Sequence, residues 1–79
     1  MHFECLRNLK AGESALVYKV TVNGDLGRRL REMGLVPDTK LTMMGRAPLN
    51  DPVEVKLMGY NLTLRNNEAD HILVRQEQV

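Results

Sequence analysis

The 79-residue sequence contains one cysteine, two histidines and no long hydrophobic run. A single cysteine cannot form an intramolecular disulfide, which excludes a small secreted scaffold held together by several bridges. No stretch approaches the ~18 consecutive apolar residues of a membrane-spanning helix, and the first residues lack the basic and apolar regions of a signal peptide. We therefore expect a cytoplasmic protein that reaches a membrane only through a partner.

A strong excess of charge of one sign is also lacking, because 11 basic residues stand against 10 acidic ones and the net charge is +1. Domains that bind duplex nucleic acid are usually strongly basic, since phosphate contacts supply most of their affinity. The charge therefore predicts neither a nucleic acid nor a bulk anionic membrane surface as partner. With 43% hydrophobic and 27% charged residues, the composition is that of an ordinary globular protein. The length fits one domain over residues 1–79.

Much of the chain alternates between apolar and polar residues with the period of two that is typical of β-strands. The predicted strands are residues 14–22, 39–46, 52–58, 60–65 and 71–75. In the first of them, the residues assigned to one face are Leu16, Tyr18, Val20 and Val22. The residues predicted to be mostly buried are Val20, Leu30, Val55, Leu62, Leu64 and Ile72. Five short strands separated by turn residues predict a mainly β fold, a small barrel, with a single helical turn at residues 66–70.

One short amphipathic helix is predicted over residues 25–33. Its apolar stripe, at i, i+4 and i+7, consists of Leu26, Leu30 and Met33. Asp25 is expected to cap the first turn, and Gly34 to end the helix in the left-handed conformation. A glycine inside a helix costs about 1 kcal/mol relative to alanine, so Gly27 predicts close packing at that position.

The sequence offers little for catalysis. It contains no Gly-rich phosphate loop followed by lysine and Ser/Thr, no GxSxG motif and no carboxylate pair that can be placed in a cleft. The histidines His2 and His71 lie near the start of the chain and at the start of a predicted strand. We therefore expect a protein that is not an enzyme and that carries no cofactor.

Potential metal ligands occur near both ends of the chain. His2, Glu4 and Cys5 are close together, and Asp70 and His71 are adjacent. A structural zinc site usually takes four ligands from Cys and His residues at recognisable spacing, and this chain has one Cys and two His. We therefore expect no metal site within the chain and a mostly buried Cys5 that behaves as a small hydrophobic residue. A weak metal site shared between two chains stays open as the alternative.

The segment APLNDPVEV, residues 47–55, places Leu49 in a turn between two prolines. Leu49 either packs beneath the barrel or contacts a partner, and both interpretations stay open. Met43 and Met44 are adjacent in a predicted strand and therefore point to opposite faces. An outward Met44 beside Leu49 would form an apolar patch of the kind found at contact sites.

The predicted helix carries Arg28, Arg29 and Arg31 on its polar side, and at least one of Arg28 and Arg29 is exposed on any helical model. These arginines form a solvated face, a docking face for an acidic partner, or an arginine finger inserted into a partner's nucleotide site. Arginine suits docking because it makes bidentate contacts to carboxylates and phosphates. The sequence leaves these three interpretations open.

Two long segments together indicate a family. GDLGRRLREMGLVPDT, residues 24–39, and APLNDPVEVKLMGYNLTLRNNEADHILV, residues 47–74, resemble the ferrous iron transport protein A family, FeoA. The opening LRNLKAGESALV, residues 6–17, also fits, so the resemblance covers nearly the whole chain. No single motif is specific, but their order and spacing are. The one departure is Asp38, where glycine is common, and Asp also suits turns.

The resemblance implies an SH3-like barrel with one short helix inserted after the first long strand. It also implies a cytoplasmic accessory protein that binds and modulates FeoB, the GTP-dependent ferrous iron transporter of bacteria. The partner-binding residues predicted on this basis are Arg28, Arg29, Met44, Pro48, Leu49 and Asp51. The alternatives are a ferrous-iron carrier or sensor that uses His2, Cys5 and His71, and an activator of the partner's GTPase through Arg28 or Arg29. We expect no nucleic-acid partner, no membrane insertion, and a monomer or weak dimer.

Overall fold

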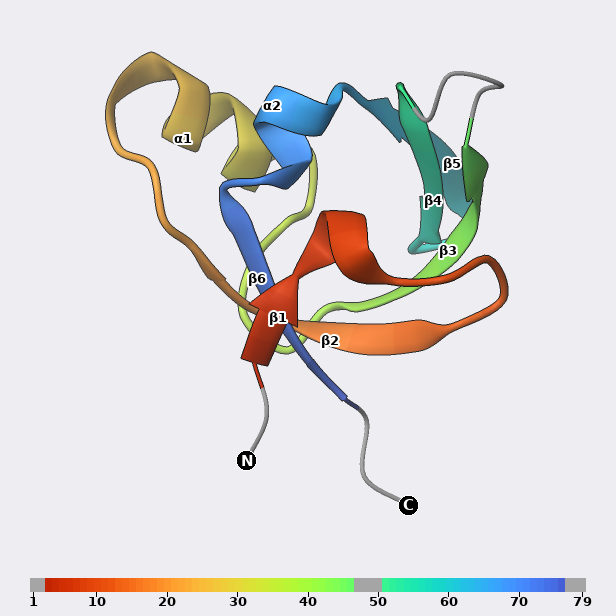
Figure 1. Ribbon diagram of the computed structural model, residues 1–79. Helices are drawn as coiled ribbons and strands as arrows, with labels where there is room; N and C mark the ends of the chain where they lie inside the picture. The colour runs from red at the N-terminus through yellow and green to blue at the C-terminus, as the bar shows by residue number, and fades with distance from the viewer. Residues whose placement is uncertain (1–2, 47–50, 77–79) are drawn as a thin grey trace.

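The structure is a computed structural model, which describes residues 3–46 and 51–76 (Figure 1). Six antiparallel strands form one sheet in the order β1-β6-β2-β3-β4-β5. The strands are β1 (Phe3–Cys5), β2 (Ser14–Val20), β3 (Lys40–Arg46), β4 (Val53–Leu57), β5 (Tyr60–Leu64) and β6 (Ile72–Gln76). The helices are a 3₁₀ turn η1 (Leu6–Asn8), α1 (Gly24–Glu32) and the single turn α2 (Asn66–Ala69). The predicted mainly β fold with one short inserted helix is confirmed.

The sheet is strongly curved, and both α-helices lie above β1, β2 and β6 in Figure 1. The curvature wraps the inward side chains into one core that the 3₁₀ turn and α1 complete with Leu6 and Leu30. The two ends of the sheet, β1 and β5, are not hydrogen-bonded neighbours. The barrel is therefore partly open, whereas full closure would remove both edges.

The alternation in β4 is confirmed in full, because Val53, Val55 and Leu57 are buried and the residues between them are exposed. Of the six residues predicted to be buried, all but Leu62 are buried in the core. Leu62 is half-buried and packs against the core from β5. Leu62 lies in the middle of an end strand, which has a neighbour on one side only, whereas the buried Leu64 lies at the end of β5 that leads into α2.

The register predicted for β2 is wrong in its first part. Ala15 and Val17 are buried there, whereas Leu16 is half-buried and Tyr18 is exposed. The pairing of β2 with β6 shifts between Val17 and Lys19. This irregularity adds one residue to β2, which reverses the alternation, so that Val20 is buried as predicted.

The prediction also lacked β1, a sixth strand of three residues. Phe3, Glu4 and Cys5 pair with β6 at the other end of the sequence. Three residues are too few to show a period of two. The strand exists because β6 offers a free edge.

Helix α1 begins one residue earlier than predicted. Its N-cap is Asn23, without a side-chain hydrogen bond, and Asp25 lies within the first turn. The expected capping role of Asp25 is therefore wrong, because its carboxylate pairs with Arg28 instead. The predicted end is confirmed: Gly34 has a φ of +102° directly after the last turn, a conformation that glycine adopts without steric cost.

Candidate partner-binding surface

Arg28 and Arg29, two of the predicted contact residues, lie on the exposed side of α1. Arg28 Nη2 lies 3.0 Å from Asp25 Oδ1, and the Arg28 side chain is 69% exposed. Such an exposed pair contributes little to stability, so Arg28 can exchange it for an acidic group of a partner. Arg29 is exposed in the last turn, where the helix dipole favours a cation. Arg31 points elsewhere, because its guanidinium donates to the carbonyl oxygen of Val22 at 3.3 Å.

Met44 lies in an irregular part of β3. The pairing of β3 with β4 shifts between Met43 and Gly45, so Met44 is the extra residue of a β-bulge. Met43 is fully buried and Met44 is 46% exposed. The predicted opposite orientation of the two methionines is confirmed, and the bulge places an apolar side chain at the surface.

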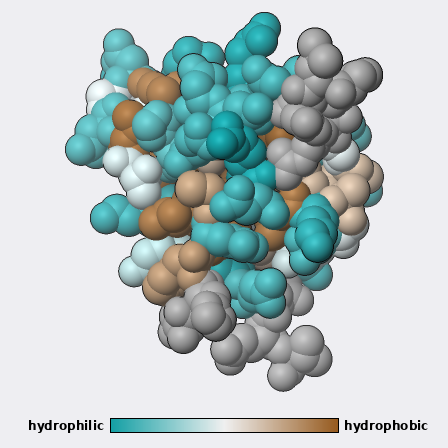
Figure 2. Space-filling view, in the orientation of Figure 1, coloured by the Kyte–Doolittle hydropathy of each residue, from teal (hydrophilic) through white to brown (hydrophobic). Residues whose placement is uncertain are grey.

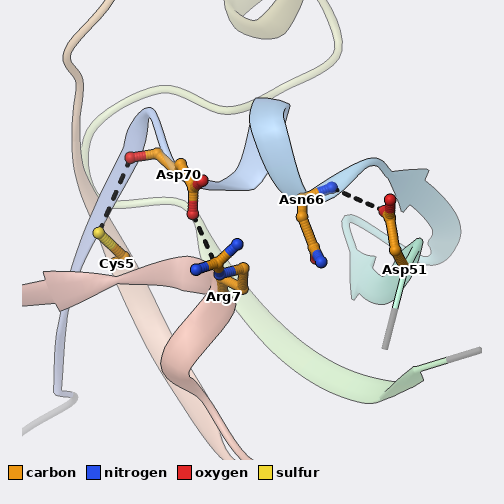
Figure 3. A network of polar contacts seen from close by, with 5 residues as sticks. All are labelled: Cys5, Arg7, Asp51, Asn66 and Asp70. Atoms are coloured by element: carbon orange, nitrogen blue, oxygen red, sulfur yellow. Dashed lines mark hydrogen bonds and ion pairs between the residues drawn. The ribbon is translucent and has the colours of Figure 1, made fainter. Parts of the chain in front are cut away.

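Asp51 has a structural partner. Its Oδ1 atom accepts a hydrogen bond from the backbone amide of Asn66 at 2.9 Å (Figure 3). Asn66 is the first residue of α2, where backbone amides have no partner within the helix. Asp51 therefore joins the segment before β4 to the start of α2.

The predicted contact residues do not form one group. In Figure 1, α1 lies at the upper left, while β3 and β4 lie at the right, with α2 between them. Arg28 and Arg29 are thus separated from Met44 and Asp51. Pro48 and Leu49 lie outside the described residues. Both interpretations of Leu49 therefore stay open.

A contact that the sequence analysis missed joins the end of α1 to the hairpin between β4 and β5. The Tyr60 hydroxyl donates a hydrogen bond to the carbonyl oxygen of Met33. A Cβ atom built on Gly34 would lie 3.0 Å from Met58 Sδ and 3.5 Å from the Tyr60 hydroxyl. We call Arg29, Met33, Gly34, Met58 and Tyr60 the helix–hairpin surface.

The turn of this hairpin is unusual at Met58. Met58 and Gly59 have φ values of +51° and +82°, as two-residue hairpin loops with positive φ at both positions require. Asn or Gly is preferred at the first position, because the left-handed conformation costs other residues roughly 1–2 kcal/mol. Met58 is nevertheless 71% exposed. The only sequence signal was a bulky residue before Gly59, between two alternating segments.

Two further exposed aromatic side chains belong to strands β1 and β2. Phe3 of β1 and Tyr18 of β2 pack their rings together, with centroids 4.1 Å apart. Figure 2 shows that hydrophobic atoms reach this face of the molecule in small separate patches between hydrophilic ones. Exposed apolar residues scattered in this way are normal for a soluble surface, and they do not by themselves mark a site.

The potential metal ligands are brought together only in part. Cys5 Sγ lies 3.7 Å from the carbonyl oxygen of Asp70, whose side chain pairs with Arg7 Nε at 3.1 Å (Figure 3). Cys5 is half-buried rather than mostly buried, because it lies in the end strand β1. Within residues 3–46 and 51–76, no three His, Cys, Asp or Glu side chains form a group that could hold a metal ion. His2 lies outside those ranges, so the metal alternative stays a prediction.

Residues 5–76 match the FeoA domain family. The chain belongs to the FeoA family. A curated relative, the Fe(2+) transport protein A/Fe(2+) transporter FeoB fusion protein of Porphyromonas gingivalis, is 38% identical over 69 residues. The match covers 87% of this FeoA chain but only 8% of the length of that relative.

Solved FeoA structures have the same fold. The FeoA protein of Chlorobium tepidum is 43% identical, with a TM-score of 0.87 over 95% of this chain and 71% of that one. The Stenotrophomonas maltophilia FeoA complexed with zinc is 31% identical, with a TM-score of 0.78. That match covers 89% of this chain and 87% of the other chain. That protein is described as a prokaryotic SH3 domain protein. The SH3-like fold and the FeoA family are therefore confirmed.

In the described parts of the chain, no helix has the length and apolar character that crossing a membrane requires.

Proposed function

We propose that this FeoA chain is a cytoplasmic, non-catalytic accessory of ferrous iron uptake that binds a FeoB-type transporter and modulates it by protein–protein contact. The main support is the relative from Porphyromonas gingivalis, which is named as a fusion of Fe(2+) transport protein A with the transporter FeoB. A fusion keeps the two parts at high effective concentration. A separate chain reaches the same arrangement only by binding.

The helix–hairpin surface is the proposed docking site. It combines Met58 and Tyr60 with the exposed Arg29, and methionine, tyrosine and arginine are enriched at protein interfaces. The left-handed conformation of Met58 supports this role. Unfavourable backbone conformations persist mainly where function needs them, and the fold alone would be served better by Asn.

Charge sets the kind of partner segment that fits. Arg29 lies one helical turn before Met33, so both side chains share one side of α1. A guanidinium is suited to bidentate contact with a carboxylate. The proposed partner segment is therefore apolar in its centre and acidic at the edge that meets α1.

The test is capture of the purified transporter in detergent by this chain, with and without GTP. Met58→Asp and Arg29→Glu are expected to abolish or strongly reduce capture, whereas Lys19→Glu on the exposed part of β2 should leave it unchanged. Met44→Asp distinguishes the helix–hairpin surface from the bulge in β3. If Met44→Asp is the only variant that prevents capture, the bulge is the docking site and the helix–hairpin surface is not.

No capture under any nucleotide condition would contradict the proposal. Anaerobic titration of the chain with ferrous iron would then test the alternative of a metal carrier that uses His2, Cys5 and His71. A partner GTPase rate that rises on mixing, and falls back with Arg28→Ala or Arg29→Ala, would favour the alternative of an activator.

A further inference from the structure

In the part of the chain that the structure describes, β5 is the last strand of the sheet and has β4 as its only neighbour. Its other edge is free among these residues. Tyr60 and Leu57 flank the two-residue turn and form the first pair of the hairpin, and in such hairpins this pair is hydrogen-bonded. Bonded and non-bonded pairs alternate along an antiparallel ladder. The N–H and C=O groups of Asn61 and Thr63 therefore point away from β4.

These groups find no backbone partner among residues 3–46 and 51–76. Neither Asn61 nor Thr63 takes part in a backbone hydrogen bond outside its own strand pair there, and both residues are exposed. Asn61 uses its side chain toward β4, where Nδ2 donates to Glu54 Oε2 at 3.1 Å. Within the described residues, the outward backbone groups of Asn61 and Thr63 are thus available for pairing.

The edge of β5 also lacks the features that usually prevent pairing between molecules. Natural edge strands are blunted by charged residues, proline, a bulge or very short length. β5 has five residues, YNLTL, with no charge and no proline, and its pairing with β4 is regular. The opposite edge, β1, is protected by its length of three residues.

We propose that β5 is a self-association edge, which pairs antiparallel with β5 of a second copy of this chain about a two-fold axis through Leu62. In this register, Asn61 of each copy lies opposite Thr63 of the other, and the two residues exchange both backbone hydrogen bonds. Leu62 faces Leu62 of the second copy in a non-bonded pair, where side chains approach most closely. Tyr60 lies opposite Leu64.

Two features of β5 favour a second copy as the occupant. Among the symmetric registers, the one with its axis through Leu62 pairs both outward residues of each strand with outward residues of the other strand. A shift by one pair in one direction brings Thr63 opposite Gly59 in the turn. A shift in the other direction brings Asn61 opposite Arg65, whose amide already donates to Glu68 Oε1 at 2.9 Å. Because β5 carries no charge, no like charges meet across the axis, and the half-buried Leu62 gains an apolar neighbour.

Sedimentation equilibrium of the full chain from micromolar to millimolar concentration is the first test. The weight-average mass is expected to rise from 9.0 kDa toward twice that value. Thr63→Pro removes an outward N–H that β4 does not use, and proline is tolerated where a strand N–H faces solvent. This variant should lose the mass increase, whereas the matched control Thr63→Val keeps the donor and should retain it.

Amide hydrogen exchange of the unmodified chain keeps the proposal testable if Thr63→Pro fails to fold. The amides of Asn61 and Thr63 should exchange more slowly as protein concentration rises, while Leu62, already bonded to β4, should change little. A chain that stays monomeric at millimolar concentration overturns the proposal, and so does a dimer without protection at Asn61 and Thr63. Protection that arises only on adding the transporter would show that the occupant is a partner strand and not a second copy.

Discussion

Gly27 of α1 lies so close to the carbonyl group of Val22 that a Cβ atom on this glycine would overlap the Val22 oxygen. The same Cβ atom would lie 3.1 Å from Arg31 Nη1. This approach brings the first half of α1 against the segment that connects β2 to the helix. The sequence predicted close packing here because a glycine weakens a helix, and the structure shows the atoms responsible.

The first prediction concerns Gly27→Ala. Helix propensity alone would make this change stabilising by about 1 kcal/mol, but the backbone of Val22 cannot yield as a flexible side chain would. We expect a net loss of about 1–3 kcal/mol in the free energy of unfolding, measured by urea denaturation. Gly45→Ala is the control, since a Cβ there meets nothing within 4 Å. A higher melting temperature for Gly27→Ala would contradict the close approach.

The second prediction concerns Asp51, whose carboxylate accepts the Asn66 amide. Asp51→Ala should lower the free energy of unfolding by about 1–2 kcal/mol, because the first amide of α2 loses its acceptor. Asp51→Asn retains an acceptor oxygen and should cost less. Hydrogen exchange of the Asn66 amide is the local measurement. If Asp51→Ala is as stable as the unmodified chain, the hydrogen bond between Asp51 and the Asn66 amide does not stabilise the fold.

The third prediction compares two Leu→Ala changes on opposite sides of the sheet. Leu64 is buried in β5, and its truncation should cost about 2–5 kcal/mol, a large share of the stability of so small a domain. Leu16 lies half-buried on the other side of β2, so Leu16→Ala should cost about 1 kcal/mol or less. Thermal unfolding monitored by circular dichroism compares them. Equal losses would show that the register of β2 is wrong.

Sequence patterns predicted correctly those parts of the fold that have one buried face and regularly spaced apolar residues. Val53, Val55 and Leu57 alternate without interruption, and Leu26, Leu30 and Met33 recur at helical spacing. The irregularity between Val17 and Lys19 was not visible, because a bulge depends on the partner strand and leaves no periodic signal. The same holds for β1, whose pairing with β6 joins residues more than 60 positions apart.

In the candidate site, too, some features could be predicted from local sequence patterns and others could not. The exposure of Met44 followed from its alternation with Met43, and the polar side of α1 from helical periodicity. The contact of Tyr60 with Met33 did not follow, because it joins a hairpin to a helix end that is distant in sequence. Local patterns report which face a residue occupies, whereas contacts between elements come from the packing of the whole chain.

The last prediction uses Met58 to separate stability from binding. Met58→Asn replaces a residue that is strained at φ +51° with one that adopts this conformation readily, in the favoured Asn-Gly sequence. The free energy of unfolding should rise by about 1 kcal/mol, measured by urea denaturation. Capture of the transporter should fall at the same time, because the exposed thioether is lost.

A comparison with Met58→Leu completes this test. Leucine keeps an apolar side chain on the helix–hairpin surface but also keeps the backbone cost, so it should retain most of the capture without any gain in stability. If Met58→Asn lowers stability, packing of the thioether on Gly34 outweighs the conformational cost, and strain is no argument for function. If Met58→Asn is more stable and binds as well as the unmodified chain, the docking site lies elsewhere, and the bulge at Met44 becomes the surface to test.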